Sequence, residues 1–370
     1  MNRLVNVALA IGITLLTYLL GEGLFAVFQG DQLHRSLIQR LIARVASVGD
    51  PASRFFRPVL TDPAEIEVLL DALRREGVGL GNSPYDELQT EQASISREVD
   101  GCPQGRPDIA KTVTFLRTPL FETFNPIVMF YDAGRTLSAP LSRLVDRYAV
   151  RLTSYSTDAF GLRRTVPLVD AADMVWVAGD SVAVGAMVDD VETLASVLQS
   201  HDSERRYLNL GHGGAEAAEI RCNLERAADR YPGRVRELIY VYCENDFDES
   251  ESMGTPESVI GWLQQFVAEQ GIGRTTVVYA PYIFNVVPES TRIPGTRGER
   301  FEDHADEKAR LIRLVADADF DWLDFGEIAL DEADAQGSPF GALSMYIDVV
   351  HHSPQGIERL AQALRARRER

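Results

Sequence analysis

Cysteine is scarce in this chain. Only Cys102, Cys222 and Cys243 occur among 370 residues. They lie far apart and form neither a Cys-x-x-Cys pair nor a cluster with histidine, so the sequence indicates no disulfide framework and no structural zinc site. One disulfide is compatible with three cysteines, but the sequence does not select the pair.

An excess of positive charge is also missing. Aspartate and glutamate number 55 against 37 lysines and arginines, which gives a net charge of −18. Such a chain repels phosphate backbones, so nucleic-acid binding is disfavoured. Hydrophobic residues make up 45% of the chain, enough for a large core, and the length favours more than one structural unit.

One long apolar run is present, close to the N-terminus. Residues 4–28 are almost continuously apolar, interrupted chiefly by Asn6 and Glu22. This length matches the roughly 20 residues that a helix needs to cross a bilayer. A cleaved signal peptide is the alternative, but the run is long and no clear Ala-x-Ala cleavage site follows it. We therefore expect a transmembrane anchor over residues 1–30, with the membrane as a partner of this protein.

The next stretch, residues 31–150, contains no motif with an evident chemical role. Its pattern predicts a small accessory region of mixed α and β structure. The predicted elements are a helix within 61–77, a long polar loop over 78–108, strands within 111–118 and 126–132, and a helix within 138–148.

From about residue 170 the chain alternates regularly between apolar strands and amphipathic helices. This alternation predicts a parallel sheet with helices on both faces. Ligands of such sheets bind beyond the carboxyl ends of the strands. The predicted strands lie at 173–179, 205–211, 237–243, 275–281 and 320–326, and the predicted helices at 191–200, 215–231, 258–270, 305–318 and 354–368.

The tripeptide Gly179-Asp180-Ser181 lies where the first of these strands gives way to a helical run. A serine at such a turn presents its hydroxyl at the sheet edge, next to free backbone N–H groups and the positive end of a helix dipole. The tripeptide alone is weak evidence, because turns are rich in all three residue types. Its weight depends on the residues that follow the other strands.

Two further segments follow strand ends, and a third precedes the final helix. Asp348 and His351 are three positions apart before the final helix, so the carboxylate can orient the imidazole, which can then take the proton of Ser181. The glycine-rich turn at 209–214 can donate backbone N–H groups, and Asn245 can donate its amide to an oxyanion. Taken singly, each is equally compatible with an ordinary turn or helix cap.

Together these blocks resemble those of the SGNH (GDSL-like) hydrolase family, in the same order along the chain. The resemblance covers roughly residues 150–370, and the segment 157–164 is similar to the lead-in of membrane-anchored members. It implies a flavodoxin-like three-layer α/β sandwich with a central parallel sheet. We therefore expect an anchor over 1–30, an accessory region over 31–150 and an SGNH hydrolase-like catalytic domain over 151–370.

The resemblance also implies a role for each matching residue. Ser181 would be the nucleophile, His351 the base and Asp348 the residue that orients the base. The oxyanion hole would consist of the backbone N–H groups of Ser181 and Gly214 and the side-chain amide of Asn245. No metal and no organic cofactor is required by this chemistry.

Some positions depart from the family pattern or complicate the assignment. Cys243 stands where the third block normally has glycine, and we expect it to be a packed residue at a strand end. His212 and His352 are additional histidines near the site; His351 is preferred as the base because Gly356 follows it by five positions. Ala183 replaces the last glycine of a Gly-x-Ser-x-Gly elbow, which disfavours the α/β-hydrolase alternative.

Three functions compete for this constellation. The preferred one is a serine esterase that hydrolyses an acyl ester, with acetyl as the expected group, on a small molecule or a glycan or lipid of the cell envelope. An O-acyltransferase would use the same triad and pass the acyl group to a polysaccharide hydroxyl. A binding protein with a retired site is the non-catalytic alternative. The segment 285–304, rich in proline, glycine and charge, is the expected lid over the site.

The membrane orientation has conflicting indications. Arg3 precedes the apolar run, whereas Arg35, Arg40 and Arg44 follow it, and the positive-inside rule alone would leave the bulk of the protein in the cytoplasm. The family resemblance implies the opposite placement. We adopt the extracytoplasmic placement of the catalytic domain as the expectation.

Overall fold

The computed structural model describes Leu60 and residues 63–76, 78–81, 95–99, 101–116, 127–247, 255–287, 304–338 and 340–368. The expected membrane segment over 1–30 and most of the expected lid over 285–304 lie outside these residues. Among the helices so described, none has the length and apolar character that a bilayer span requires.

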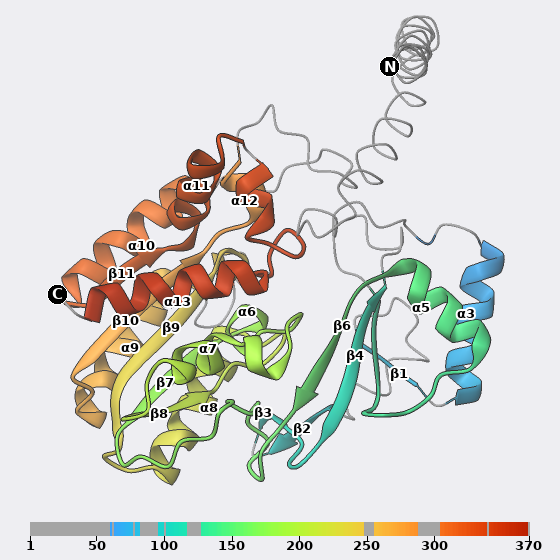
Figure 1. Ribbon diagram of the computed structural model, residues 1–370. Helices are drawn as coiled ribbons and strands as arrows, with labels where there is room; N and C mark the ends of the chain where they lie inside the picture. Colours follow the sequence, from blue (N-terminus) through green and yellow to red (C-terminus); the bar gives the residue numbers. More distant parts are fainter. Residues whose placement is uncertain are drawn as a thin grey trace, which may run out of the picture. The chain divides into compact units, whose positions relative to one another are not determined.

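A five-stranded parallel sheet forms the centre of the C-terminal part (Figure 1). Its spatial order is β11-β10-β9-β7-β8, which in chain order is the 2-1-3-4-5 arrangement of flavodoxin-like folds. Nearly every position of the three central strands is buried, which explains their almost wholly apolar sequences. The strands are β7 (Met174–Gly179), β8 (Arg206–Asn209), β9 (Val235–Cys243), β10 (Arg274–Ala280) and β11 (Asp321–Asp324).

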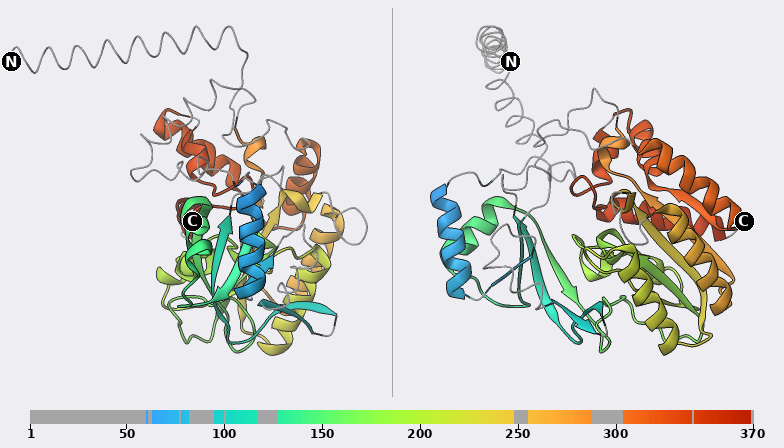
Figure 2. Two further views of the ribbon diagram at one scale, coloured as in Figure 1. Left: turned by 90° about the vertical axis from the view of Figure 1, so that its right-hand side faces the viewer. Right: turned by 180° about the vertical axis from the view of Figure 1, so that it is seen from behind.

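Helices cover both faces of this sheet, so the expected three layers are present (Figure 2). On one face, α8, α9 and α10 bury their apolar sides against Trp176, Leu238 and Val277. On the other face, α7 and α11 each contact α13. The helices are α6 (Ser181–Val184), α7 (Leu194–Ser200), α8 (Ala217–Arg230), α9 (Pro256–Gln270), α10 (Ala305–Asp317), α11 (Phe325–Gln336), α12 (Phe340–Ser344) and α13 (Pro354–Arg368).

A separate antiparallel sheet, in the order β1-β5-β4-β6, lies earlier in the chain. Its core packs Leu116 and Met129 of the sheet against Leu69 and Leu141 of two helices. The elements are α3 (Pro63–Glu76), β1 (Gly79–Gly81), β4 (Ala110–Leu116), β5 (Ile127–Asp132), α5 (Ala139–Tyr148) and β6 (Ala149–Ser156). The expected domain boundary between residues 150 and 151 falls within β6, and the division into domains stays a prediction.

The expectation of a loop over 78–108 was wrong for its described residues; residues 82–94 of this stretch lie outside them. This stretch holds β1 and the hairpin of β2 (Ser96–Val99) with β3 (Cys102–Gly105). The sequence hides these strands because they are short and contain glycine, proline and charged residues, which are depleted in strands. Tertiary contacts compensate for these unfavourable strand residues. Strand β1 pairs with β5, and Gly105 lies so close to Gly161 that a Cβ on Gly105 would be 2.1 Å from the carbonyl oxygen of Gly161.

A disulfide between Cys102 and Cys222 attaches this hairpin to α8, with the two Cα atoms 6.1 Å apart. Arg226 of α8 strengthens the attachment by donating to the carbonyl oxygen of Val99 at 3.1 Å and to Oε1 of Gln104 at 3.2 Å. The structure thus selects the pair that the sequence left open, and Cys243 is a free, buried thiol.

Candidate active site

Ser181 begins α6 directly after β7. Gly179 in the turn has φ +147°, and a Cβ there would lie 2.6 Å from the carbonyl oxygen of Val241, so the position requires glycine. Asp180 caps the helix, with its Oδ1 accepting the N–H of Val182 at 2.9 Å. The turn delivers Ser181 to the carboxyl edge of the sheet between β7 and β9, where the strand order reverses.

His351 lies 170 positions later, in the loop between α12 and α13, and its Nε2 is 3.0 Å from Oγ of Ser181. Its Nδ1 is 2.8 Å from Oδ2 of Asp348. The other carboxylate oxygen of Asp348 accepts the backbone N–H groups of Val350 and His351 at 2.8 and 2.7 Å. The structure therefore brings the three residues of the expected triad into one hydrogen-bonded chain, with the carboxylate itself held in place.

The surroundings of His351 determine its protonation. Burial alone would lower its pKa, but the charge of Asp348 and its hydrogen bond to Nδ1, together with the charge of Asp180, raise the pKa above the ordinary histidine value. An imidazole with a raised pKa is a stronger base, which suits the removal of a hydroxyl proton.

Asp180 is a second carboxylate beside the serine. It is 2% exposed, and its Oδ2 lies 3.4 Å from Oγ of Ser181, farther than Nε2 of His351 at 3.0 Å. Burial raises the pKa of Asp180, against the opposing effects of the Val182 N–H and of His351. Sequence reasoning treated this residue only as part of the tripeptide; its position between a wholly apolar strand and the serine was the available signal.

The neighbouring residues His351 and His352 have different environments in the structure. His352 is 4% exposed and stacks on Phe325 with the ring centroids 3.5 Å apart. Burial, and secondarily the charge of His351, lowers the pKa of His352 to about 3, so it stays neutral. The preference for His351 over His352 agrees with this geometry. His212 lies on the glycine-rich turn, where its backbone N–H donates to the carbonyl oxygen of Gly179 at 3.1 Å.

The glycine-rich turn after β8 is held against α6. The side chain of Asn209 is buried and donates from Nδ2 to the carbonyl oxygen of Val184 at 3.3 Å. Gly211 approaches so closely that a Cβ would lie 2.2 Å from the nitrogen of Val184. Gly214 has φ +71°, and its N–H donates to no group in the described part of the chain. Its backbone N–H is thus available to a ligand.

Asn245 lies in the 3₁₀ turn Glu244–Phe247 that follows β9. Its Oδ1 is buried without a hydrogen-bond partner, and its Nδ2 makes no hydrogen bond to any described residue. Cys243 precedes this turn and is fully buried, as expected for a packed residue. Burial, reinforced by nearby carboxylates, raises the pKa of the Cys243 thiol well above its usual value, which makes it a poor nucleophile.

Glu244 is a buried carboxylate whose importance sequence reasoning missed. It accepts hydrogen bonds from the Tyr279 hydroxyl at 2.8 Å, the Tyr282 N–H at 2.5 Å and Nδ2 of Asn285 at 2.8 Å. Burial raises its pKa, against these three donors. Glu244 thereby ties the turn that carries Asn245 to the segment after β10. A charged residue directly after an apolar strand was the signal for it.

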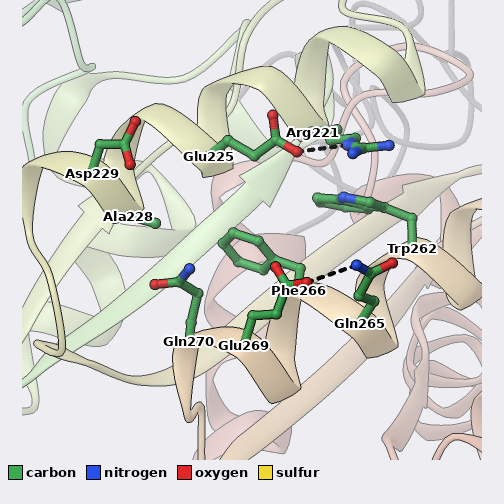
Figure 3. A pocket seen from close by; sticks show the side chains of 9 residues that line it. All are labelled: Arg221, Glu225, Ala228, Asp229, Trp262, Gln265, Phe266, Glu269 and Gln270. Carbon is green, nitrogen blue, oxygen red and sulfur yellow. Dashed lines mark hydrogen bonds and ion pairs between the residues drawn. The ribbon is translucent and has the colours of Figure 1, made fainter.

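Among the described residues, no group of three or more His, Cys, Asp or Glu is arranged to hold a metal ion. A shallow groove between α8 and α9 is lined chiefly by polar side chains, with Arg221 paired to Glu225 at 2.7 Å and placed over the ring of Trp262 (Figure 3). None of its lining residues belongs to the constellation around Ser181.

No family model and no curated protein matches the sequence. Similar solved structures include a member of the lipolytic protein G-D-S-L family from Veillonella parvula DSM 2008, with 16% identity over 53% of this chain and 97% of that chain and a TM-score of 0.38. The acetyl xylan esterase AlAXEase has 15% identity over 53% and 98% of the two chains, with a TM-score of 0.41. A catalytic mutant of the acetylxylan esterase Axe2 from Geobacillus stearothermophilus has 14% identity over 53% and 94%, with a TM-score of 0.37.

Proposed function

We propose that this protein is a serine ester hydrolase of the SGNH type. The observation that carries the proposal is the chain of contacts from Asp348 through both ring nitrogens of His351 to the Ser181 hydroxyl, at 2.8 and 3.0 Å. A serine hydroxyl is a weak nucleophile unless a base is positioned to take its proton. Here Asp348 orients the base, and the charges of Asp348 and Asp180 together make it more basic.

The reaction proceeds in two halves. Oγ of Ser181 attacks the acyl carbonyl while Nε2 of His351 takes the hydroxyl proton, and Asp348 stabilises the imidazolium that forms. The tetrahedral intermediate collapses to an acyl-serine, and the leaving alcohol receives the proton from His351. Water then attacks the acyl-serine, gives its proton to His351, and releases the carboxylic acid as Ser181 regains its hydrogen.

Three donors would stabilise the negative charge on the carbonyl oxygen: the backbone N–H groups of Ser181 and Gly214 and the side-chain amide of Asn245. Two observations support this assignment. The Gly214 N–H and the Asn245 Nδ2 each have no acceptor among the described residues. Free donors at the edge of a sheet can serve a developing oxyanion without first breaking a bond.

The substrate that we propose is an acyl ester, with acetyl as the expected group, on a carbohydrate or lipid of the cell envelope. An anchor over residues 1–30 would hold the enzyme at this substrate. The Cys102–Cys222 disulfide supports an extracytoplasmic placement, because disulfides persist in oxidising compartments. Protease treatment of intact cells tests the placement: an extracytoplasmic domain is degraded, whereas a cytoplasmic one survives until the cells are lysed.

The test of the catalytic proposal is labelling of the full-length, detergent-solubilised protein with a fluorophosphonate probe. We expect labelling of the wild type and of the control His201→Ala, whose imidazole is 39% exposed and pairs with Glu358 at 3.8 Å. We expect none in Ser181→Ala or His351→Ala. Absence of labelling in a folded wild type would contradict the proposal. Release of acyl groups to water, rather than to an added glycan, separates hydrolysis from acyl transfer.

A further inference from the structure

Arg163 lies outside the expected triad, in the segment 157–173 that leads from β6 into β7. Its backbone forms an isolated bridge with Asn209 at the end of β8, the edge strand of the parallel sheet. The side chain is completely buried, and its guanidinium lies over the ring of Tyr155 at 4.6 Å. A buried arginine is costly unless its charge and its hydrogen-bond donors are matched.

The match is complete, since a guanidinium has five N–H donors and this one has five acceptors. Nε contacts Oδ1 of Asp190 at 3.1 Å. Nη1 donates to the carbonyl oxygens of Val184, at 3.1 Å, and Gly185. Nη2 donates to the carbonyl oxygens of Ser154 at 3.0 Å and Val188 at 2.6 Å. One side chain thus joins three different segments of the chain.

Three of these acceptors belong to the turn that follows Ser181. The helix α6 has only four residues, too few to be stable by its own hydrogen bonds; the carbonyl groups of Ser181 and Val182 accept the N–H of Gly185, whereas that of Val184 has no partner within the helix. Arg163 donates to the carbonyl oxygen of Val184 and to that of Gly185, which also accepts the N–H of Val188 at 3.2 Å. Asn209 supplies another donor to Val184, at 3.3 Å. The position of α6, and with it that of Ser181, therefore depends on groups from outside the helix.

The other two acceptors lead to β6. Ser154 belongs to that strand, and Asp190 accepts from the N–H and the hydroxyl of Ser156 in β6 at 3.1 and 2.5 Å. Asp189 adds a parallel link by accepting the N–H of Ser154 at 2.6 Å. The antiparallel sheet and the segment after α6 are thus connected by the buried ion pair between Arg163 and Asp190, beside the contacts that Ser154 and Arg151 of β6 make with Asp189.

We propose that Arg163 is a positioning residue for Ser181: it holds the turn after α6 against β6 and thereby maintains the contact between Ser181 and His351. This inference rests on the proposed function, since the consequence of the contact is catalysis. A misplacement of about 1 Å at a nucleophile can lower turnover by about 10²-fold, even when the substituted residue lies away from the reacting atoms.

The test compares Arg163→Ala and Arg163→Lys with the control Arg164→Ala in the full-length protein. Arg164 is the adjacent arginine, but its side chain is 51% exposed and its ion pair with Asp108 spans 3.6 Å. With a small ester, we expect kcat of Arg163→Ala to fall by about 10- to 100-fold with little change in KM. Added guanidinium, below denaturing concentrations, should restore part of kcat in this variant alone.

Hydrogen exchange gives a readout that does not depend on activity. We expect faster exchange over residues 182–188 in Arg163→Ala, with unchanged exchange in α9. A folded Arg163→Ala variant with wild-type kcat overturns the inference, as does an equal loss in Arg164→Ala. If Arg163→Ala does not fold, the kcat of Arg163→Lys is measured instead. A wild-type kcat in Arg163→Lys also overturns the inference. Failure of both to fold would make Arg163 a folding determinant and overturn the positioning role. An inactive wild type, in contrast, contradicts the proposed function itself.

Discussion

His351 differs from an ordinary histidine in having a defined partner at each ring nitrogen, Asp348 at Nδ1 and Ser181 at Nε2. Since the general base must be neutral, the raised pKa places the acid limb of kcat/KM above the pH near 6.5 expected for an unperturbed histidine. By linkage, the protonated imidazole stabilises the fold below its unfolded-state pKa, and this contribution is lost as the pH rises through the folded-state pKa.

Asp348→Asn tests this account of the base. Removing the carboxylate leaves burial as the main influence on the imidazole, so the acid limb should move to lower pH. The backbone N–H groups of Val350 and His351 would hold the amide oxygen, so the amide nitrogen would face Nδ1 and favour the wrong imidazole tautomer, which should also lower kcat by about 10³- to 10⁴-fold. The pH dependence of ester hydrolysis, measured for the wild type and for Asp348→Asn, gives both effects. An acid limb at the same pH in both proteins would show that Asp348 does not set the pKa of His351.

Asn245→Ala tests the amide of the oxyanion hole. Loss of one such donor typically lowers kcat by about 10²- to 10³-fold, so we expect the variant to be slow but measurable. Cys243→Ala is the matched control two positions earlier, because its buried thiol packs in the core and takes no part in the proposed reaction. Near-normal kcat in Asn245→Ala would remove this residue from the mechanism.

At the scale of elements, the connection from β7 to α6 is the most constrained part of the site. Gly179 in this connection has a positive φ, and the carbonyl oxygen of Val241 occupies the space that a side chain would need. Both constraints arise from the backbone, so a change of rotamer in a neighbouring side chain relieves neither. The strand is fixed between β8 and β9, and the helix is capped by Asp180 at its beginning. Small changes here should therefore affect both stability and turnover.

Gly179→Ala is the corresponding prediction. The added Cβ would lie 2.6 Å from the oxygen of Val241, and we expect a loss of about 1–3 kcal/mol in the free energy of unfolding together with a fall in kcat. Gly261→Ala, in the middle of α9, is the control: nothing lies within 4 Å of its Cβ, and alanine should stabilise the helix by up to about 1 kcal/mol. Urea unfolding of the wild type and of both variants measures the free energies of unfolding. Equal values for Gly179→Ala and the wild type would contradict the steric argument.

At the scale of the whole molecule, the alternating pattern after residue 170 was sufficient to predict all five strands of the parallel sheet, because buried parallel strands are apolar throughout. It also placed Ser181, Asp348 and His351 at one edge. The strands β4 and β5 of the accessory region were also predicted, but β1, β2 and β3 escaped prediction because pairing partners and a disulfide, rather than their own residues, stabilise them. Arg163 and Glu244 were missed for a related reason: their roles depend on acceptors and donors from segments that periodicity does not bring together.

The Cys102–Cys222 disulfide gives a prediction at this same scale. It joins residues 120 positions apart, so it restricts the unfolded chain strongly, and its loss should cost about 2–4 kcal/mol. Thermal unfolding of the full chain with and without reductant measures this. Reductant should lower Tm in the wild type and in Cys243→Ala, but not further in Cys222→Ala. A wild-type Tm that is indifferent to reductant would show that the bridge contributes nothing.

The separation of 170 positions between Ser181 and His351 has a consequence for biosynthesis. A ribosome adds Ser181 long before it adds Asp348 and His351, so a nascent chain that ends before them holds the serine without its imidazole partner. Under the proposed function, such an incomplete copy would have a serine hydroxyl with no base to take its proton and would not hydrolyse esters.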